Sequence, residues 1–213
     1  VAFKLPTMFR SIPTHLLVPI YISNIGFEKY GIWLSFLALI SIFFLFDPGF
    51  TFVLPPRLAQ LNLQKNKFER NKFYTSSFLL NFILSILLIV LFLLGILICY
   101  KLDFHNKSLN FCYENKYLIS IYIISQTYYS FVGFVSLGLE IKKASGIIQV
   151  FTNLVYISMV LILITRNFGI ISFLIANVLR NISYFLIHIV EYHHFYSTLI
   201  HFLYQFCKEF LFS

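Results

Sequence analysis

Long apolar runs dominate this chain. The clearest is Phe78 to Cys99, which contains no charged residue. At a rise of about 1.5 Å per residue, 20 such residues cross a hydrocarbon core of about 30 Å. A backbone in lipid must satisfy its own hydrogen bonds, so the run predicts a membrane-spanning α-helix.

Six segments of this kind are expected, and the connections between them are mostly short. Short connections favour antiparallel neighbours in a helical bundle. We therefore predict an all-α membrane protein with one six-helix lobe over residues 1–190. The expected spans are about 5–25, 31–54, 76–99, 117–139, 145–165 and 169–190.

The segment after the sixth span, residues 191–213, is aromatic and carries histidine and lysine residues. Such a segment is typical of an amphipathic helix along the interface. It is also compatible with the start of a seventh span, and the sequence does not separate the two.

Composition excludes a soluble fold, because 59% of the residues are hydrophobic and 11% charged, against about 25% charged in soluble domains. The net charge of +8 reflects topology rather than nucleic-acid binding, since Lys and Arg mark cytoplasmic loops. Residues 60–72 are basic and too polar for lipid. With both termini cytoplasmic, that side receives ten of the sixteen basic residues: Lys4, Arg10, Arg57, Lys65, Lys67, Arg70, Lys72, Lys142, Lys143 and Lys208.

No motif indicates an enzyme or a cofactor. The chain has no phosphate-binding loop, zinc-protease motif, catalytic carboxylate pair or nucleophile elbow. The three cysteines lack metal-ligand spacing. Cys99 and Cys112 are either free thiols or a disulfide on the outer side.

Charged residues inside the first two spans are candidates for a polar cavity, because charge at bilayer depth is costly. Arg10 lies in a first span that three prolines interrupt. It either lines a cavity or snorkels to the interface. Asp47 precedes Pro48 and Gly49, and Arg57 or Arg10 could neutralise it; alternatively, Asp47 caps the following segment in water.

The sixth span carries the most deeply placed cation, Arg180, with Asn177 and Asn181 at helical spacing on one face. Its expected partner is a bound phosphate or Asp47; the alternative is a structural pair between helices. The fourth span holds a polar run over residues 125–130. These groups bind either sugar hydroxyls or neighbouring helices.

Several short motifs in the first 60 residues share an order and spacing with a known transporter family. They are Ile25-Gly26 with Tyr30-Gly31, then Asp47-Pro48-Gly49, then Arg57-Leu58-Ala59. In this order they resemble the opening of the polysaccharide biosynthesis flippases. These are the Wzx-like O-antigen and capsule transporters of the multidrug/oligosaccharidyl-lipid/polysaccharide exporter superfamily. Members have twelve or more helices in two lobes, so the chain resembles the N-terminal lobe.

The resemblance implies flipping of undecaprenyl-pyrophosphate-linked oligosaccharide across the bacterial inner membrane, for O-antigen, capsule or exopolysaccharide synthesis. The pyrophosphate would be held by Arg10, Arg57 and Arg180 with Asn177, and Asp47 would neutralise one arginine in the empty state. Implied partners are the lipid-linked oligosaccharide, membrane lipids, and a polysaccharide polymerase or a second lobe or protomer. The alternatives are a cation-coupled drug exporter of the same superfamily and a non-transporting membrane subunit.

Overall fold

The computed structural model describes residues 18–44, 50–64, 67–102, 107–139 and 142–191. Every secondary-structure element within these ranges is an α-helix, which confirms the predicted all-α class. A first helix over residues 18–25 ends at Gly26, whose φ of 89° lies in the left-handed region that glycine tolerates. The others are α2 (Phe27–Phe44), α3 (Phe50–Leu63), α4 (Lys67–Lys101), α5 (Lys107–Glu114), α6 (Lys116–Gly138), α7 (Lys142–Thr165) and α8 (Ile171–Glu191).

Four of the described helices are long and apolar enough to cross a bilayer: Phe68–Lys101, Lys116–Gly138, Ser145–Thr165 and Ile171–His188. The protein is therefore membrane-embedded, but the described residues give four spans rather than the predicted six. The first predicted span falls mostly outside these residues. The second, predicted at 31–54, is divided: α2 ends at Phe44 and α3 begins at Phe50. With 14 residues, or about 21 Å, α3 is shorter than the hydrocarbon core.

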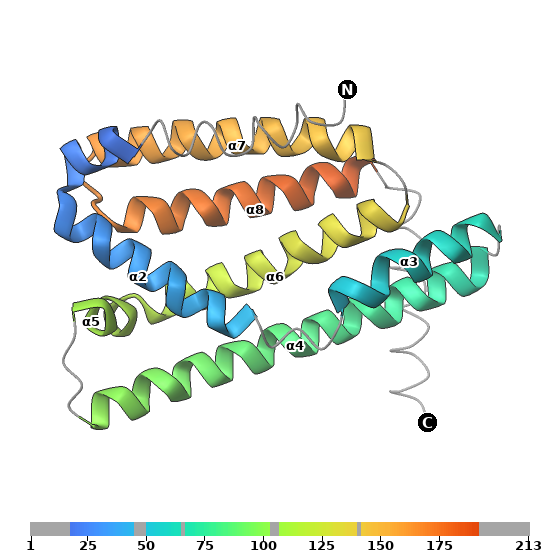
Figure 1. The fold of residues 1–213 in the computed structure, drawn as a ribbon, viewed down its shortest axis with the longest axis horizontal. Helices are drawn as coiled ribbons and strands as arrows, with labels where there is room; N and C mark the ends of the chain where they lie inside the picture. The colour runs from blue at the N-terminus through green and yellow to red at the C-terminus, as the bar shows by residue number, and fades with distance from the viewer. Residues whose placement is uncertain (1–17, 45–49, 65–66, 103–106, 140–141, 192–213) are drawn as a thin grey trace.

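The segment 60–72, which the sequence predicts to be too polar for lipid, lies mostly in the two helices of a hairpin. α3 continues to Leu63, and α4 begins at Lys67. Arg70 Nη1 donates to Asn62 Oδ1 at 2.9 Å and ties the two helices together. The segment contains neither glycine nor proline, so it can be helical in water although it is too polar for lipid. In Figure 1 this hairpin extends past the neighbouring ends of α6 and α8.

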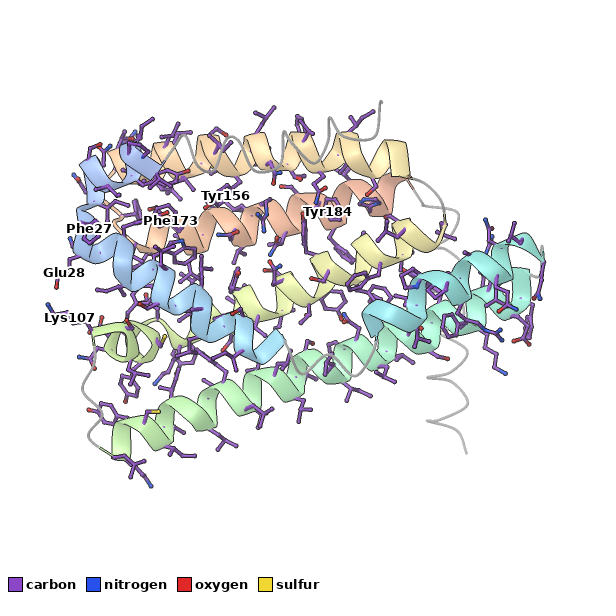
Figure 2. The ribbon with its side chains drawn as sticks, viewed as in Figure 1. Phe27, Glu28, Lys107, Tyr156, Phe173 and Tyr184 are labelled. Carbon is purple, nitrogen blue, oxygen red and sulfur yellow. The ribbon has the colours of Figure 1, made fainter. Side chains whose placement is uncertain are left out.

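The core of the bundle is built on α8, which lies between α6 and α7 (Figure 1) and packs extensively on both. At one end of α8, Phe173 stacks on Trp33 of α2 with ring centroids 5.2 Å apart. Figure 2 shows Phe173 beside α2, where α8 begins. At the other end, Tyr184 belongs to a second buried cluster, which also includes Leu58 of α3 and Phe131 of α6. α8 thus connects both hydrophobic clusters.

The end of the bundle that holds α5 is the predicted outer side. Lys107 of α5 forms an ion pair with Glu28 of α2, and this contact lowers the pKa of the Glu28 carboxyl. Both side chains are exposed, so the pair adds little to stability. Cys99 and Cys112 are free thiols, so the disulfide alternative is not realised.

We expect the two thiols to differ sharply in reactivity. Cys112 on α5 is 1% exposed, and burial raises its pKa to about 11, whereas Cys99 is half-buried. Maleimides attack the thiolate, so at pH 7 Cys99 should react at least about tenfold faster. In intact cells carrying Cys207→Ser, a membrane-impermeant maleimide should label Cys99. The single-thiol variants Cys99→Ser and Cys112→Ser identify the labelled site. Labelling of Cys99 only after permeabilisation would invert the predicted orientation.

Candidate functional site

Arg180 lies at the middle of the α8 span. It is nine residues, or about 14 Å, from Ile171, and the apolar segment ends at His188. An isolated cation at this depth costs at least about 2.5 kcal/mol on insertion scales. The sequence predicted this depth, because residue count along a spanning helix sets it directly.

Two tyrosine rings from different helices enclose the guanidinium of Arg180. Its Cζ lies 5.0 Å from the ring centroid of Tyr129 on α6 and 5.5 Å from that of Tyr156 on α7. Figure 2 places Tyr156 between α7 and α8. Ring faces attract a cation by about 2 kcal/mol when water is excluded. The rings therefore offset part of the cost of burying this charge without neutralising it.

Asn181, which is 1% exposed, holds Arg180 in a fixed orientation. Its Oδ1 accepts hydrogen bonds from Arg180 Nε at 3.3 Å and Nη2 at 3.2 Å. Its Nδ2 donates to Ser125 Oγ at 3.2 Å and Gln126 Oε1 at 3.0 Å, both on α6. One amide thus connects the arginine to the α6–α8 contact.

Asn177 completes the cluster one turn before Arg180. Its Nδ2 donates to the Phe173 carbonyl at 2.9 Å, and its side chain lies beside Tyr156. Asn181 hydrogen-bonds Arg180, and Asn177 lies beside Tyr156, one of the two rings that enclose Arg180, so the three residues predicted to share a helix face form one cluster.

A polar stripe continues from this cluster toward the end of α8. Asn177, Asn181, Tyr184 and His188 follow at intervals of four, three and four residues, which places them on one helix face. The Tyr184 hydroxyl lies 3.2 Å from Ser145 Oγ on α7, and the rings of Tyr184 and His188 are 4.5 Å apart. The polar face therefore extends from mid-membrane to the predicted cytoplasmic end.

The fourth-span polar run serves mainly to join helices. Ser125 and Gln126 accept from Asn181, and the Tyr129 hydroxyl accepts from Gln149 Nε2 on α7 at 2.9 Å. The Thr127 hydroxyl donates a hydrogen bond to the Ile124 carbonyl of its own helix. This arrangement favours the interhelix alternative over direct recognition of a glycan.

The other predicted site residues are not joined to this cluster. Arg10 and Asp47 lie outside the described residues, so the proposed Asp47–Arg180 pair stays a prediction. Arg57 is exposed on α3 and donates to Gln60 Oε1 at 2.7 Å. Pro55 and Leu58 of α3 pack directly on Gly138 of α6, which is nine residues, or about 14 Å, beyond Tyr129. Arg57 therefore lies at a different position along the bundle axis from Arg180.

Sequence reasoning missed the contribution of α7. Gln149, Thr152 and Tyr156 are polar or part-polar residues at intervals of three and four within an apolar span, and Thr152 is fully buried. This helical spacing was the available signal. Composition does not single out Tyr156, because the chain has 14 tyrosines.

An open groove of about 410 Å³ lies on the other side of Asn181, between α4, α6 and α8. Its lining is mainly apolar and aromatic, with few polar atoms. The lining residues are Phe78, Ile121, Ile124, Ser125, Tyr128, Asn181, Ile182 and Phe185. Ile121 and Ile182 are 49% and 42% exposed, so the groove faces the lipid.

The cluster combines a guanidinium with hydroxyl and amide groups, a chemistry that suits an anion. Within the described residues, no carboxylate forms an ion pair with Arg180, and the four spans contain one acidic residue, Glu69, in the first turn of α4. A guanidinium presents paired donors to phosphate or carboxylate oxygens, and hydroxyl and amide groups can add further bonds.

No family model matches the chain, and no curated protein or solved structure is significantly similar to it.

Proposed function

We propose that this chain moves an anionic, lipid-linked oligosaccharide across a bacterial inner membrane, with both termini in the cytoplasm. The observation that carries the proposal is Arg180, a cation at mid-bilayer depth with no carboxylate partner among the described residues. The substrate would be an undecaprenyl-pyrophosphate-linked glycan for O-antigen, capsule or exopolysaccharide synthesis.

A charged headgroup meets a large free-energy barrier when it crosses the bilayer. A pyrophosphate carries its charge through a region in which uncompensated charge is strongly unfavourable. A fixed guanidinium at the midpoint lowers that barrier, and exclusion of water strengthens the attraction. Arg180 donates from Nε and Nη2 to Asn181 Oδ1. Its Nη1 group makes no hydrogen bond to another described residue. That edge is available to a phosphate oxygen.

The charge pattern supports a flippase over a cation-coupled drug exporter. A cation carrier needs acidic groups within its spans, whereas α6, α7 and the α8 span contain none and α4 has Glu69 only at its polar end. Asp47 is the one acidic residue inside a predicted span, and it lies outside the described residues. The motif resemblance of residues 16–60 to Wzx-like transporters supports the same choice. In that architecture a second lobe or protomer would supply the other wall of the cavity.

The test is transbilayer movement of a lipid-linked oligosaccharide in proteoliposomes. We expect Arg180→Gln to slow the initial rate of movement at least about tenfold, because the variant loses one modest charge contact with the substrate. Arg166→Gln is the matched control, because Arg166 is exposed in the turn between α7 and α8. Absence of movement from the folded wild-type protein, or an unchanged rate in Arg180→Gln, would refute the proposal.

A further inference from the structure

The polar cluster around Arg180 continues toward the outer end of the bundle through tyrosine side chains. Tyr156 on α7, whose ring faces Arg180, also interacts electrostatically with Tyr21 of the first helix, residues 18–25. Tyr122 on α6 interacts electrostatically with both Tyr156 and Arg180. Three different helices thus contribute a phenol beside the guanidinium or directly beyond it.

Tyr21 is the member of this set that lies nearest the outer end. Its ring packs edge-on against Phe173, with ring centroids 4.9 Å apart. Phe173 precedes Arg180 by seven residues, or about 10 Å along α8. The Tyr21 ring also lies 6.5 Å from the ring of Tyr30 on α2. Tyr21 is therefore placed between Arg180 and the predicted outer side.

The hydroxyl of Tyr21 is the feature that indicates a ligand. The side chain is 2% exposed, and its Oη has no hydrogen-bond partner among the described residues. Buried polar groups are nearly always hydrogen-bonded, because an unsatisfied one is strongly unfavourable. A polar ligand that extends outward from Arg180 would satisfy this hydroxyl.

We infer that Tyr21 binds the sugar next to the pyrophosphate while Arg180 holds the phosphates. The inference rests on the proposed function and adds a sugar contact to the same substrate site. A pyrophosphate-linked glycan carries hydroxyl groups directly beyond its charged end, so a headgroup anchored at Arg180 and directed outward presents them to Tyr21. A phenol both donates and accepts hydrogen bonds, which suits a sugar hydroxyl.

The sugar needs room at this position, because Tyr21 is buried against α8 in the structure. The first helix is separated from α2 by Gly26, whose φ of 89° lies in the left-handed region. Glycine tolerates a wide range of backbone angles, so the first helix can shift away from Phe173 without bending α2. That shift would expose the Tyr21 hydroxyl to the headgroup.

Binding of two related lipids tests the sugar contact. One is the pyrophosphate-linked oligosaccharide, and the other is the same polyprenyl pyrophosphate without sugars. Dissociation constants in detergent follow from the rise of the thermal midpoint with lipid concentration. Tyr21→Phe should weaken binding of the glycosylated lipid about fivefold, the effect of losing one neutral hydrogen bond, and leave binding of the bare lipid unchanged. Arg180→Gln should weaken binding of both.

Two comparisons separate a binding defect from a folding defect. Tyr21→Phe keeps the ring contacts and removes an unsatisfied hydroxyl, so its thermal midpoint without lipid should equal or exceed that of wild type. Tyr74→Phe removes an equally buried hydroxyl from α4, in the second hydrophobic cluster, and should bind both lipids as wild type does. Equal loss for both lipids in Tyr21→Phe, no loss for either, or no binding of the glycosylated lipid to wild type would overturn the inference.

Failure of this inference and failure of the proposed function are distinguishable. Movement that depends on Arg180, combined with unchanged lipid binding by Tyr21→Phe, would retain the flippase and remove the sugar contact. Selective loss of the glycosylated lipid in Tyr21→Phe, without movement by the wild-type protein, would retain the contact and remove the flippase.

Discussion

Replacing Asn181 with aspartate is expected to slow transbilayer movement strongly while the helical bundle stays folded. The carboxylate has nearly the shape of the amide, so it can accept the same two bonds from Arg180 Nε and Nη2. Ser125 can turn its hydroxyl to donate to the new oxygen, and the Gln126 amide can rotate to do the same. The substitution therefore changes charge with little change in volume.

The consequence for an anionic substrate is severe. The introduced carboxylate would neutralise Arg180 and place a negative charge beside the phosphate, and like charges in apposition cost several kcal/mol. We expect the initial rate to fall roughly a hundredfold, or about 2.7 kcal/mol, more than in Arg180→Gln, which only removes the attraction. The measurement is the proteoliposome assay with matched amounts of protein.

Two controls isolate the charge effect of this substitution. Asn110→Asp makes the same chemical change at an exposed position on α5 and should leave the rate unchanged. The thermal midpoint of Asn181→Asp in detergent should lie within a few degrees of wild type, because a buried ion pair roughly breaks even with its cost of desolvation. A folded Asn181→Asp protein that moves substrate at the normal rate would show that Arg180 is purely structural.

Four of the six predicted spans, and the position of Arg180 within the last of them, were predictable because both follow from counting. An apolar run of given length sets a span, and a residue's position within that run sets its depth. The segment 60–72 was not predictable in the same way. Hydropathy reports whether a segment enters lipid, and it carries no information on whether a polar segment is helical in water.

The partners of Arg180 were only half predictable. Asn177 and Asn181 lie on the same helix, so their spacing identified them. Tyr129 comes from α6 and Tyr156 from α7, and whether their rings meet Arg180 depends on how the helices pack and rotate. The same limit applies to Arg57. The sequence shows its charge, whereas the packing of α3 on α6 sets its position along the bundle axis.

The second large effect is expected at Gly138, where α3 packs directly against α6. A Cβ added there would lie 2.8 Å from both Leu58 Cβ and the Pro55 carbonyl oxygen, and 3.1 Å from Pro55 Cα. Two of these three atoms are backbone, so no side-chain rotation relieves the clash. Gly138→Ala should therefore push α3 away from α6 and lower the free energy of unfolding by about 1–3 kcal/mol.

Gly133 on the same helix is the matched control, because a Cβ there meets nothing within 4 Å. Gly133→Ala should be neutral or should stabilise α6 by up to about 1 kcal/mol, through the higher helix propensity of alanine. Thermal midpoints in detergent should thus separate the two variants in opposite directions. Limited trypsin cleavage at Arg57 should also accelerate in Gly138→Ala only, since Arg57 lies on the displaced helix α3.

Similar midpoints for both variants would mean that α3 does not depend on Gly138 for its position. The α3–α4 hairpin would then have to be held by its contacts to α4, of which the Arg70–Asn62 bond is one.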